Sequence, residues 1–198
     1  MPNGTLLYLC RHGQTDWNAV GRLQGQSDIP LNDRGREQAR RNGRTLRERL
    51  TVEGLLPDFI SSPMVRAVET MQIVRGEMGL AADGFATDER LREINFGDWQ
   101  GYEVPELRRR DRAAVQRRDA DKWGFLPPGD GAESYEMLTA RVVPFFRELA
   151  RPTLVVAHGG VMRSFLSAFC GMASDEAAHV GIPQDRILRF ENGRYDWV

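Results

Sequence analysis

The sequence predicts an α/β protein of three layers, α/β/α, in which a mostly parallel central sheet carries helices on both faces. Two observations lead to this prediction. Short apolar runs of strand length alternate with longer stretches in which apolar residues recur every three or four positions, the spacing of an amphipathic helix. Two of the short runs pass directly into a histidine followed by glycine, as expected where a buried strand ends in a loop.

In the first half of the chain, a strand is expected at Thr5–Cys10 and a second at Pro57–Ser61. Asn32 is suited to cap the helix between them, because its side chain can accept a hydrogen bond from a free backbone N–H. The pair Ser62-Pro63 is expected to cap and start the next helix. The apolar faces of these helices are formed by Ala39, Gly43, Leu46 and Leu50, and by Ala67, Met71, Val74 and Met78.

The second half continues the alternation. A strand is expected at Thr153–Ala157, and a further helix is expected to end at Gly171. Residues 186–198 are interpreted as two short strands that turn at Asn192-Gly193. The polar, arginine-rich segment 102–131 is interpreted as a helical flap and loop over the site, within a single domain of residues 1–198. The helix before the strand has an apolar face made by Leu138, Val142, Phe145 and Leu149.

Length and charge limit the class of function. A domain of 198 residues buries about 70% of its unfolded surface and needs no covalent cross-links to fold. Its 27 basic and 28 acidic residues nearly cancel, so net charge predicts no nucleic-acid partner and no membrane surface. Any attraction for anions must therefore be local. Lys122 is the only lysine, so nearly all of the basic residues are arginines. Arginine is suited to bind phosphate and carboxylate, but genomic base composition explains the preference for arginine equally well.

The expected location is cytoplasmic. The two cysteines, Cys10 and Cys170, lack the CxxC spacing of metal and redox sites, which is typical of an intracellular chain with free thiols. The first residues do not resemble a secretory signal, and no apolar run approaches the roughly eighteen residues of a membrane span. Neither secretion nor membrane insertion is expected.

Two of the three histidines, His12 and His158, stand immediately after a predicted strand and immediately before glycine. In open parallel sheets, ligands bind beyond the carboxyl ends of the strands, so both imidazoles are expected at one rim. Arg11 precedes His12, and Arg66 lies in the first turn of a helix whose free N–H groups attract anions. This combination predicts an anion site. Arg163, one turn after His158, is interpreted as a surface charge or salt-bridge partner.

Other chemistries are less well supported. Metal binding by the histidines ranks below phosphate binding, because no HxH or HExxH spacing and no obvious third ligand are present. A cysteine phosphatase needs an arginine six positions after its nucleophile, and neither cysteine has one. Asp119 and Asp121 lie in a charged stretch and do not follow an apolar strand. The GxxxxGK[ST], GxGxxG and GxSxG signatures are absent.

Five ordered blocks carry a resemblance to a known family. The first is Leu9–Thr15 (LCRHGQT), followed by Trp17-Asn18, and the last is Val156–Val161 (VAHGGV), followed by Arg163. One RHG motif alone is a weak signal, whereas blocks in this order over about residues 5–165 are specific. The chain resembles the histidine phosphatase, or phosphoglycerate mutase-like, superfamily. The three blocks between are Leu23–Leu31 (LQGQSDIPL), Ser61–Thr70 (SSPMVRAVET) and Leu91–Gly101 (LREINFGDWQG).

The resemblance implies roles for particular residues. The phosphate pocket is implied to consist of Arg11, His12, Arg66 and His158, with Glu93 as the proton donor. Supporting contacts to substrate or phosphate are implied for Asn18, Gln24, Gly25 and Gly159. No metal and no cofactor is implied. The chain departs from the family pattern at residues 129–134, where the entry to the following helix is longer.

The predicted function is metal-independent hydrolysis of a phosphomonoester through a phosphohistidine. Neutral His12 would attack phosphorus in line, while two arginines and protonated His158 neutralise the charge on the phosphoryl oxygens. Glu93 would protonate the leaving alkoxide and then activate the water that cleaves the intermediate. The expected partner is a small phosphorylated metabolite, with a phosphoprotein or a nucleotide as the other substrates left open. A homodimer is an open alternative to a monomer.

Two alternatives accompany this prediction. A phosphoglycerate mutase would use the same pocket but retain the phosphohistidine, and a non-catalytic phosphate-binding module would bind without turnover. The hydrolase is favoured because mutases of the family are typically longer and carry a Gly-Trp pattern where this chain has Gly25-Gln26. The module is disfavoured because no residue of the implied pocket is missing.

Overall fold

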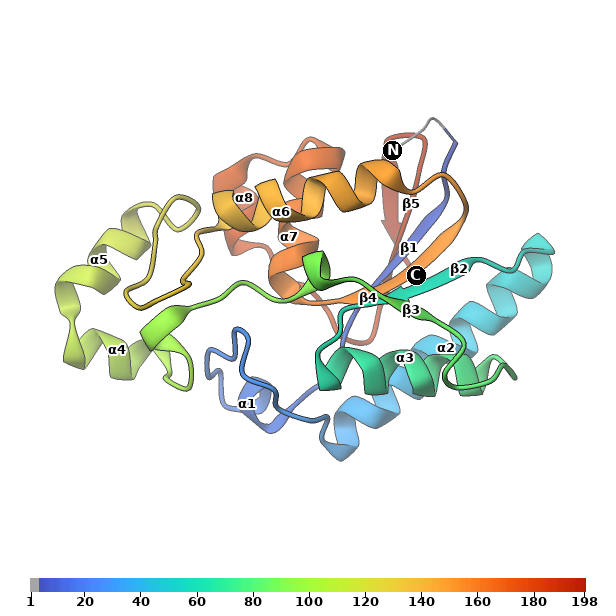
Figure 1. The fold of residues 1–198 in the computed structure, drawn as a ribbon, viewed down its shortest axis with the longest axis horizontal. Coiled ribbons are helices and arrows are strands. Elements are labelled where there is room, and N and C mark those ends of the chain that lie inside the picture. Colours follow the sequence, from blue (N-terminus) through green and yellow to red (C-terminus); the bar gives the residue numbers. More distant parts are fainter. Residues whose placement is uncertain (1–3) are drawn as a thin grey trace.

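The computed structural model describes residues 4–198, which form a six-stranded sheet between two layers of helices (Figure 1). The strand order is β3-β2-β4-β1-β5-β6. The first four strands pair in parallel, β5 pairs antiparallel with β1, and β6 pairs antiparallel with β5. The predicted fold class is therefore confirmed. The strands are β1 (Leu7–Arg11), β2 (Asp58–Ser61), β3 (Ala86–Thr87), β4 (Thr153–Ala157), β5 (Ile187–Glu191) and β6 (Arg194–Trp197).

Alternate side chains of β1 enter the two helical layers, because successive residues of a strand point to opposite faces. Leu7 and Leu9 belong to a core with α6 (Tyr135–Glu148) and α7 (Gly159–Cys170). Tyr8 and Cys10 belong to a second core with α2 (Asp33–Glu53) and α3 (Val65–Glu77). These four side chains of β1 are completely buried, so β1 is fixed from both faces. The short helix α8 (Ser174–His179) follows α7.

Several predicted boundaries agree with the structure. Asn32 caps α2 by accepting a hydrogen bond from the backbone N–H of Gly35 at 2.9 Å. Gly171 ends α7 in the left-handed conformation, with φ of 71°. Asn192 and Gly193, with φ of 52° and 75°, form the tight turn between the last two strands. The first strand begins two residues later than expected, at Leu7.

The predicted start of α3 is wrong. The helix begins at Val65, and Met64, whose side chain makes no capping bond, stands at the N-cap. Ser62 does not cap this helix, because its hydroxyl lies 2.7 Å from Nε2 of His158. The Val65 N–H instead donates to the Asp28 carboxylate at 2.8 Å.

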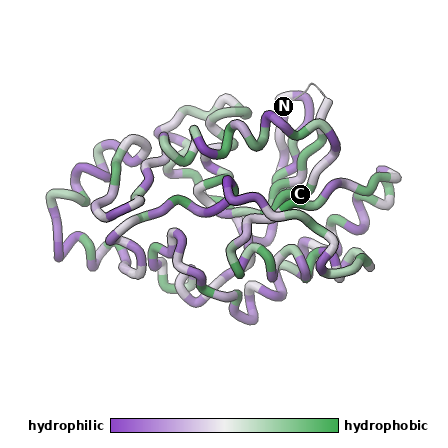
Figure 2. The backbone as a smooth tube through the Cα atoms, in the orientation of Figure 1, coloured by the Kyte–Doolittle hydropathy of each residue, from purple (hydrophilic) through white to green (hydrophobic). Residues whose placement is uncertain are grey.

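The arginine-rich segment 102–131 contains α4 (Val104–Arg110) and α5 (Arg112–Ala120), which lie beyond one end of the sheet (Figure 1). Both helices are mainly hydrophilic in Figure 2 and pack on a small apolar cluster that contains Trp99 and Leu107. The helical interpretation of this segment is confirmed. The remaining short elements are α1 (Asp16–Ala19), η1 (Glu89–Leu91) and η2 (Gly97–Trp99).

Within residues 4–198, no helix combines the length and the apolar composition that crossing a membrane requires.

Candidate active site

The register of β1 and β4 places the two histidines. Arg11 lies opposite Ala157 in this parallel pair, so the residues that follow, His12 and His158, leave the sheet side by side. Their ring centroids are 5.1 Å apart. A backbone hydrogen bond of 2.9 Å from the His12 N–H to the Ala157 carbonyl holds this arrangement. The structure thus brings the two imidazoles to one rim, as the sequence predicts.

His12 is held neutral and in one tautomer. Its Nδ1 lies 2.7 Å from the Gly13 carbonyl, which can only accept, so Nδ1 carries the proton. Nε2 is then the basic nitrogen, and it accepts a hydrogen bond from Nε of Arg66 at 3.2 Å. Burial holds the pKa of His12 well below its usual range, and the charges of Arg66 and Arg11 lower it further.

Arg66 is completely buried in the first turn of α3. Its two terminal nitrogens donate to the carbonyls of Ser27 and Gly25, each at 2.8 Å. These contacts fix the guanidinium beside His12, and burial lowers the pKa of Arg66 to about 10. Gly25 therefore contributes through its carbonyl, and its φ of 50° is a conformation that glycine adopts readily.

Three buried side-chain nitrogens of residues 4–198 have no hydrogen-bond partner, and all three belong to this region. They are Nε of Arg11, Nε of Arg22 and Nδ1 of His158. Buried polar atoms are normally paired, so unpaired ones that converge on one place indicate a missing acceptor. Arg11 is anchored separately, because its Nη1 donates to the Ile182 carbonyl at 2.8 Å. Its Nε is therefore left for a ligand.

The surroundings of His158 oppose the expected protonation of its ring. The ring is completely buried, and burial holds its pKa well below its usual range, with Arg66, His12 and Arg11 lowering it further. Nε2 lies 2.7 Å from the hydroxyl of Ser62, which also accepts from the Met64 N–H at 3.4 Å. When the Ser62 hydroxyl donates to Nε2, Nδ1 of the neutral ring carries the proton and is an N–H donor.

The Glu93 carboxylate lies at the start of α7. It accepts hydrogen bonds from the backbone N–H of Gly160, at 3.0 and 3.2 Å to its two oxygens, and from the Ile94 N–H at 2.9 Å. A side chain on Gly160 would collide with this carboxylate, so the second glycine after His158 makes room for Glu93. Backbone groups therefore orient the carboxylate toward the cavity without engaging a cationic side chain.

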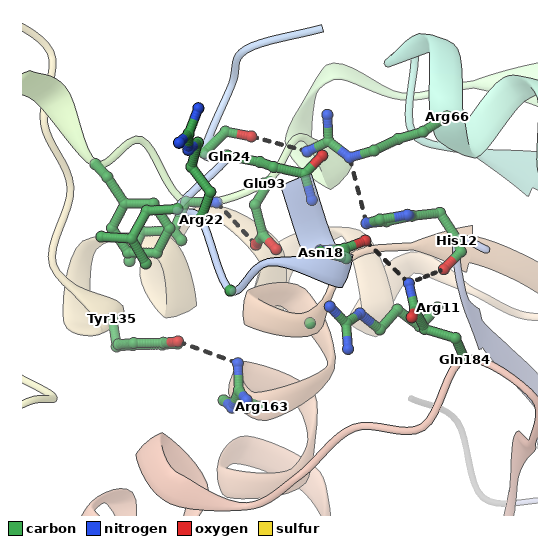
Figure 3. Close-up of a pocket in the computed structure, with 16 residues that line it drawn as sticks. Arg11, His12, Asn18, Arg22, Gln24, Arg66, Glu93, Tyr135, Arg163 and Gln184 are labelled. Atoms are coloured by element: carbon green, nitrogen blue, oxygen red, sulfur yellow. Dashed lines mark hydrogen bonds between the residues drawn. The ribbon is translucent and has the colours of Figure 1, made fainter. Parts of the chain in front are cut away.

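These residues surround a cavity of about 280 Å³ (Figure 3). His158 does not line this cavity; its ring centroid is 5.1 Å from that of His12. Asn18 is held by Gln184, whose amide donates to the Asn18 side chain and to the His12 carbonyl, both at 3.1 Å. Gln24 accepts from the Thr15 hydroxyl at 2.9 Å. The predicted residues that line the wall are Arg11, His12, Asn18, Gln24, Gly25, Arg66, Glu93 and Gly159.

Comparison with known proteins identifies the family. A sequence profile of the histidine phosphatase superfamily (branch 1) matches residues 7–198. The chain belongs to this superfamily. A 2,3-bisphosphoglycerate-dependent phosphoglycerate mutase of Parvibaculum lavamentivorans is 31% identical over 202 residues, which cover 96% of this chain and 91% of the relative.

Phosphatases of the superfamily are similar to this chain as well. A glucosyl-3-phosphoglycerate phosphatase of Mycolicibacterium vanbaalenii is 35% identical over 185 residues, which cover 85% of this chain and 76% of the relative. The solved structure of a mycobacterial glucosyl-3-phosphoglycerate phosphatase superposes with a TM-score of 0.79 at 28% identity, over 98% of this chain and 97% of that one. Membership therefore establishes an enzyme family that contains both phosphatases and mutases.

Sequence reasoning missed four polar side chains of the cavity wall: Arg22, Tyr135, Arg163 and Gln184. Arg163 is half-buried and donates to the Val180 carbonyl at 3.1 Å and to the Tyr135 hydroxyl at 3.3 Å. Its interpretation as a surface charge is therefore wrong. Its position one turn after His158 was the available signal, whereas Tyr135 and Gln184 reach the site only through the tertiary fold.

The lowered pKa of both histidines predicts acid sensitivity. Below the ordinary value of 6.5, the unfolded chain takes up protons that the folded chain refuses, so the free energy of unfolding falls as the pH falls. Each histidine contributes a slope of about 1.4 kcal/mol per pH unit until its folded pKa is reached. Urea unfolding between about pH 7 and pH 5 should show a flatter profile for His12→Asn/His158→Asn than for the unmodified protein.

His179→Asn is the matched control, because His179 is an exposed histidine on α8. It should keep the slope of the unmodified protein. Equal slopes in all three proteins would show that His12 and His158 are not held neutral by the fold.

Proposed function

We propose that this protein hydrolyses phosphomonoesters through a phosphohistidine on His12, without a metal ion. The observation that carries the proposal is the state of His12. The ring is neutral, its proton is directed to the Gly13 carbonyl, and its basic Nε2 lies among the guanidinium groups of Arg66 and Arg11. A nucleophile of fixed tautomer beside anion-binding groups is what in-line attack on a phosphoryl group needs.

In the first step, Nε2 of His12 forms a bond to phosphorus as the ester P–O bond breaks. The lone pair of Nε2 must be free to attack, so the Arg66 N–H that donates to Nε2 has to break this hydrogen bond. A phosphoryl oxygen becomes the new acceptor of that N–H. The leaving alkoxide takes a proton from Glu93. Water then attacks the phosphohistidine and gives its proton to the Glu93 carboxylate, which releases inorganic phosphate and restores neutral His12.

Phosphoryl oxygens would satisfy the unpaired nitrogens of the site. Nε of Arg11 lines the cavity and is a buried donor without an acceptor in the described chain. Nδ1 of His158 also has no partner there, and with a proton on this nitrogen a neutral His158 would donate to a phosphoryl oxygen beside His12. The arginines supply the positive charge, because the pKa of Arg66, even lowered to about 10, keeps it charged at neutral pH.

One observation supports hydrolysis over mutase activity. No residue of segment 102–131 lines the phosphate cavity, so the interpretation of this segment as a flap over the site does not hold at the phosphate itself, and the segment does not close the cavity to water. The mutase remains the second candidate because the Parvibaculum lavamentivorans enzyme matches 96% of this chain. The substrate class we propose is a small phosphorylated metabolite.

The acid role of Glu93 predicts a dependence on the leaving group. Glu93→Gln should lower kcat/KM for an alkyl phosphate such as glycerol 3-phosphate by about 100-fold or more, the range of general acid catalysis. The loss on 4-nitrophenyl phosphate should be much smaller in the first step, because nitrophenolate leaves without a proton. Steady-state kinetics on both esters give the two ratios.

Glu136→Gln, at an exposed position of α6, is the matched control and should leave both rates within about twofold. Equal losses on the two esters in Glu93→Gln would remove Glu93 from the acid role and restrict it to orienting the substrate.

The choice of hydrolase over mutase is tested by supplying 3-phosphoglycerate with 2,3-bisphosphoglycerate, in EDTA, and following 2-phosphoglycerate and free phosphate together. We expect phosphate release from at least one monoester of a metabolite panel to exceed the rate of interconversion. Interconversion faster than every hydrolysis would assign the chain to the mutases while leaving the chemistry of His12 intact.

A further inference from the structure

A second cavity, of about 190 Å³, adjoins the phosphate cavity. Because the two cavities have wall residues in common, a ligand with its phosphate at His12 has room for its remaining atoms in the second cavity. The rest of the second wall comes from α5 and the loop after it, and from Trp99 and Glu133. The shared wall residues are Leu23, Ile94, Phe96, Tyr135 and Arg163.

Three cationic side chains, Arg118, Lys122 and Arg163, line this second cavity. Among the described residues of its wall, Glu133 is the only carboxylate. Both oxygens of Glu133 are engaged by Arg141, with two contacts of 2.8 Å. Glu133 therefore does not neutralise the cations, and the cavity carries an excess of positive charge.

Lys122, the only lysine of the chain, is half-buried at the edge of α5. Its Nζ donates to the Ala178 carbonyl at 2.6 Å, and its side chain lines the second cavity. Burial, together with the positive charges of Arg163 and Arg118, lowers the pKa of Lys122 to about 8. An ammonium group that is disfavoured by its neighbours gains from an anionic ligand.

The partner of Arg118 is shared. Its Nη1 lies 3.0 Å from the Asp119 carboxylate, which also accepts from Nη2 of Arg108 at 2.8 Å. One carboxylate thus serves two arginines. Arg163 is held by the Val180 carbonyl and the Tyr135 hydroxyl, neither of which is charged.

The wall of the second cavity also carries aromatic side chains. Trp99 and Phe125 pack with ring centroids 5.0 Å apart, and Phe96 lines both cavities. Cations and aromatic rings in one small cavity suit a short organic body that ends in an acidic group.

From this arrangement we infer that the second cavity binds a negatively charged group, a carboxylate or a second phosphate, on the alcohol part of the substrate. The substrate class becomes a small phosphomonoester that is itself an acid. This inference rests on the proposed hydrolysis at His12, and it assigns Arg118, Lys122 and Arg163 to substrate selection. None of the three touches the reacting phosphorus in this assignment.

Matched substrates test it. In the first pair, glycerol 3-phosphate has a hydroxymethyl group where 3-phosphoglycerate has a carboxylate. In the second pair, fructose 1,6-bisphosphate has one phosphate more than fructose 6-phosphate. We expect kcat/KM to favour the acidic member of at least one pair by about tenfold or more, because a cationic subsite leaves its charges unpaired with a neutral ester. The preferred pair distinguishes the carboxylate from the phosphate.

Lys122→Met and Arg118→Met remove one charge each while keeping an unbranched side chain. Each should reduce the acidic-to-neutral ratio of kcat/KM at least about fivefold. Arg117→Met, at an exposed position of the same helix, is the matched control and should keep the ratio of the unmodified protein. A ratio near one in the unmodified protein, or a ratio unaffected by both variants, would overturn the inference.

A binding measurement separates this inference from the proposed function. Reductive methylation with ¹³C-formaldehyde labels Lys122 and the terminal amine alone and keeps the charge, so Lys122 gives an isolated NMR signal. The preferred acidic ester should shift this signal and its neutral partner should not. A selective shift without hydrolysis would sink the hydrolase proposal and leave the subsite standing. Hydrolysis of both esters with no selective shift would overturn the subsite inference and leave the hydrolase proposal standing.

Discussion

Strands β1 and β4 pair in parallel with Arg11 opposite Ala157, and the chemistry of the site depends on this register. A strand buried on both faces cannot slip by one residue without turning its apolar side chains to the wrong layer. The positions of His12 and His158, one residue beyond each strand, are therefore as fixed as the core itself. The glycines after each histidine let other chain segments approach, and Gly160 in particular admits the Glu93 carboxylate.

Around this fixed pair, positive charge resides on arginines while the histidines stay neutral. Burial and the neighbouring guanidinium groups hold the pKa of both imidazoles low, so His12 is unprotonated at neutral pH. The backbone anchors these cations: carbonyls of Gly25 and Ser27 hold Arg66, and the Ile182 carbonyl holds Arg11. The site is therefore preorganised for an anion, and binding requires little rearrangement of side chains.

The fold class and the histidine pair could be predicted because their signals are local: apolar periodicity, a cap at Asn32 and a histidine after each strand. The start of α3 could not be predicted. There Asp28, and not Ser62, accepts a hydrogen bond from the first turn, and this depends on contacts between distant segments. Arg163 follows His158 by about one helical turn, which is compatible with a place in the site, but only the fold shows that Arg163 lines the cavity. Glu93 was accessible through family resemblance alone, because nothing in its local sequence separates it from a surface carboxylate.

The most direct test of the account is to quench the enzyme during turnover of a ³²P-labelled monoester and to locate the label by peptide mapping. A phosphoramidate is labile to acid and stable to alkali, so we expect acid-labile, alkali-stable phosphate on His12. Recovery of the label on serine or aspartate, or on the exposed His179, would contradict the mechanism, since it would place the nucleophile outside the β1–β4 rim.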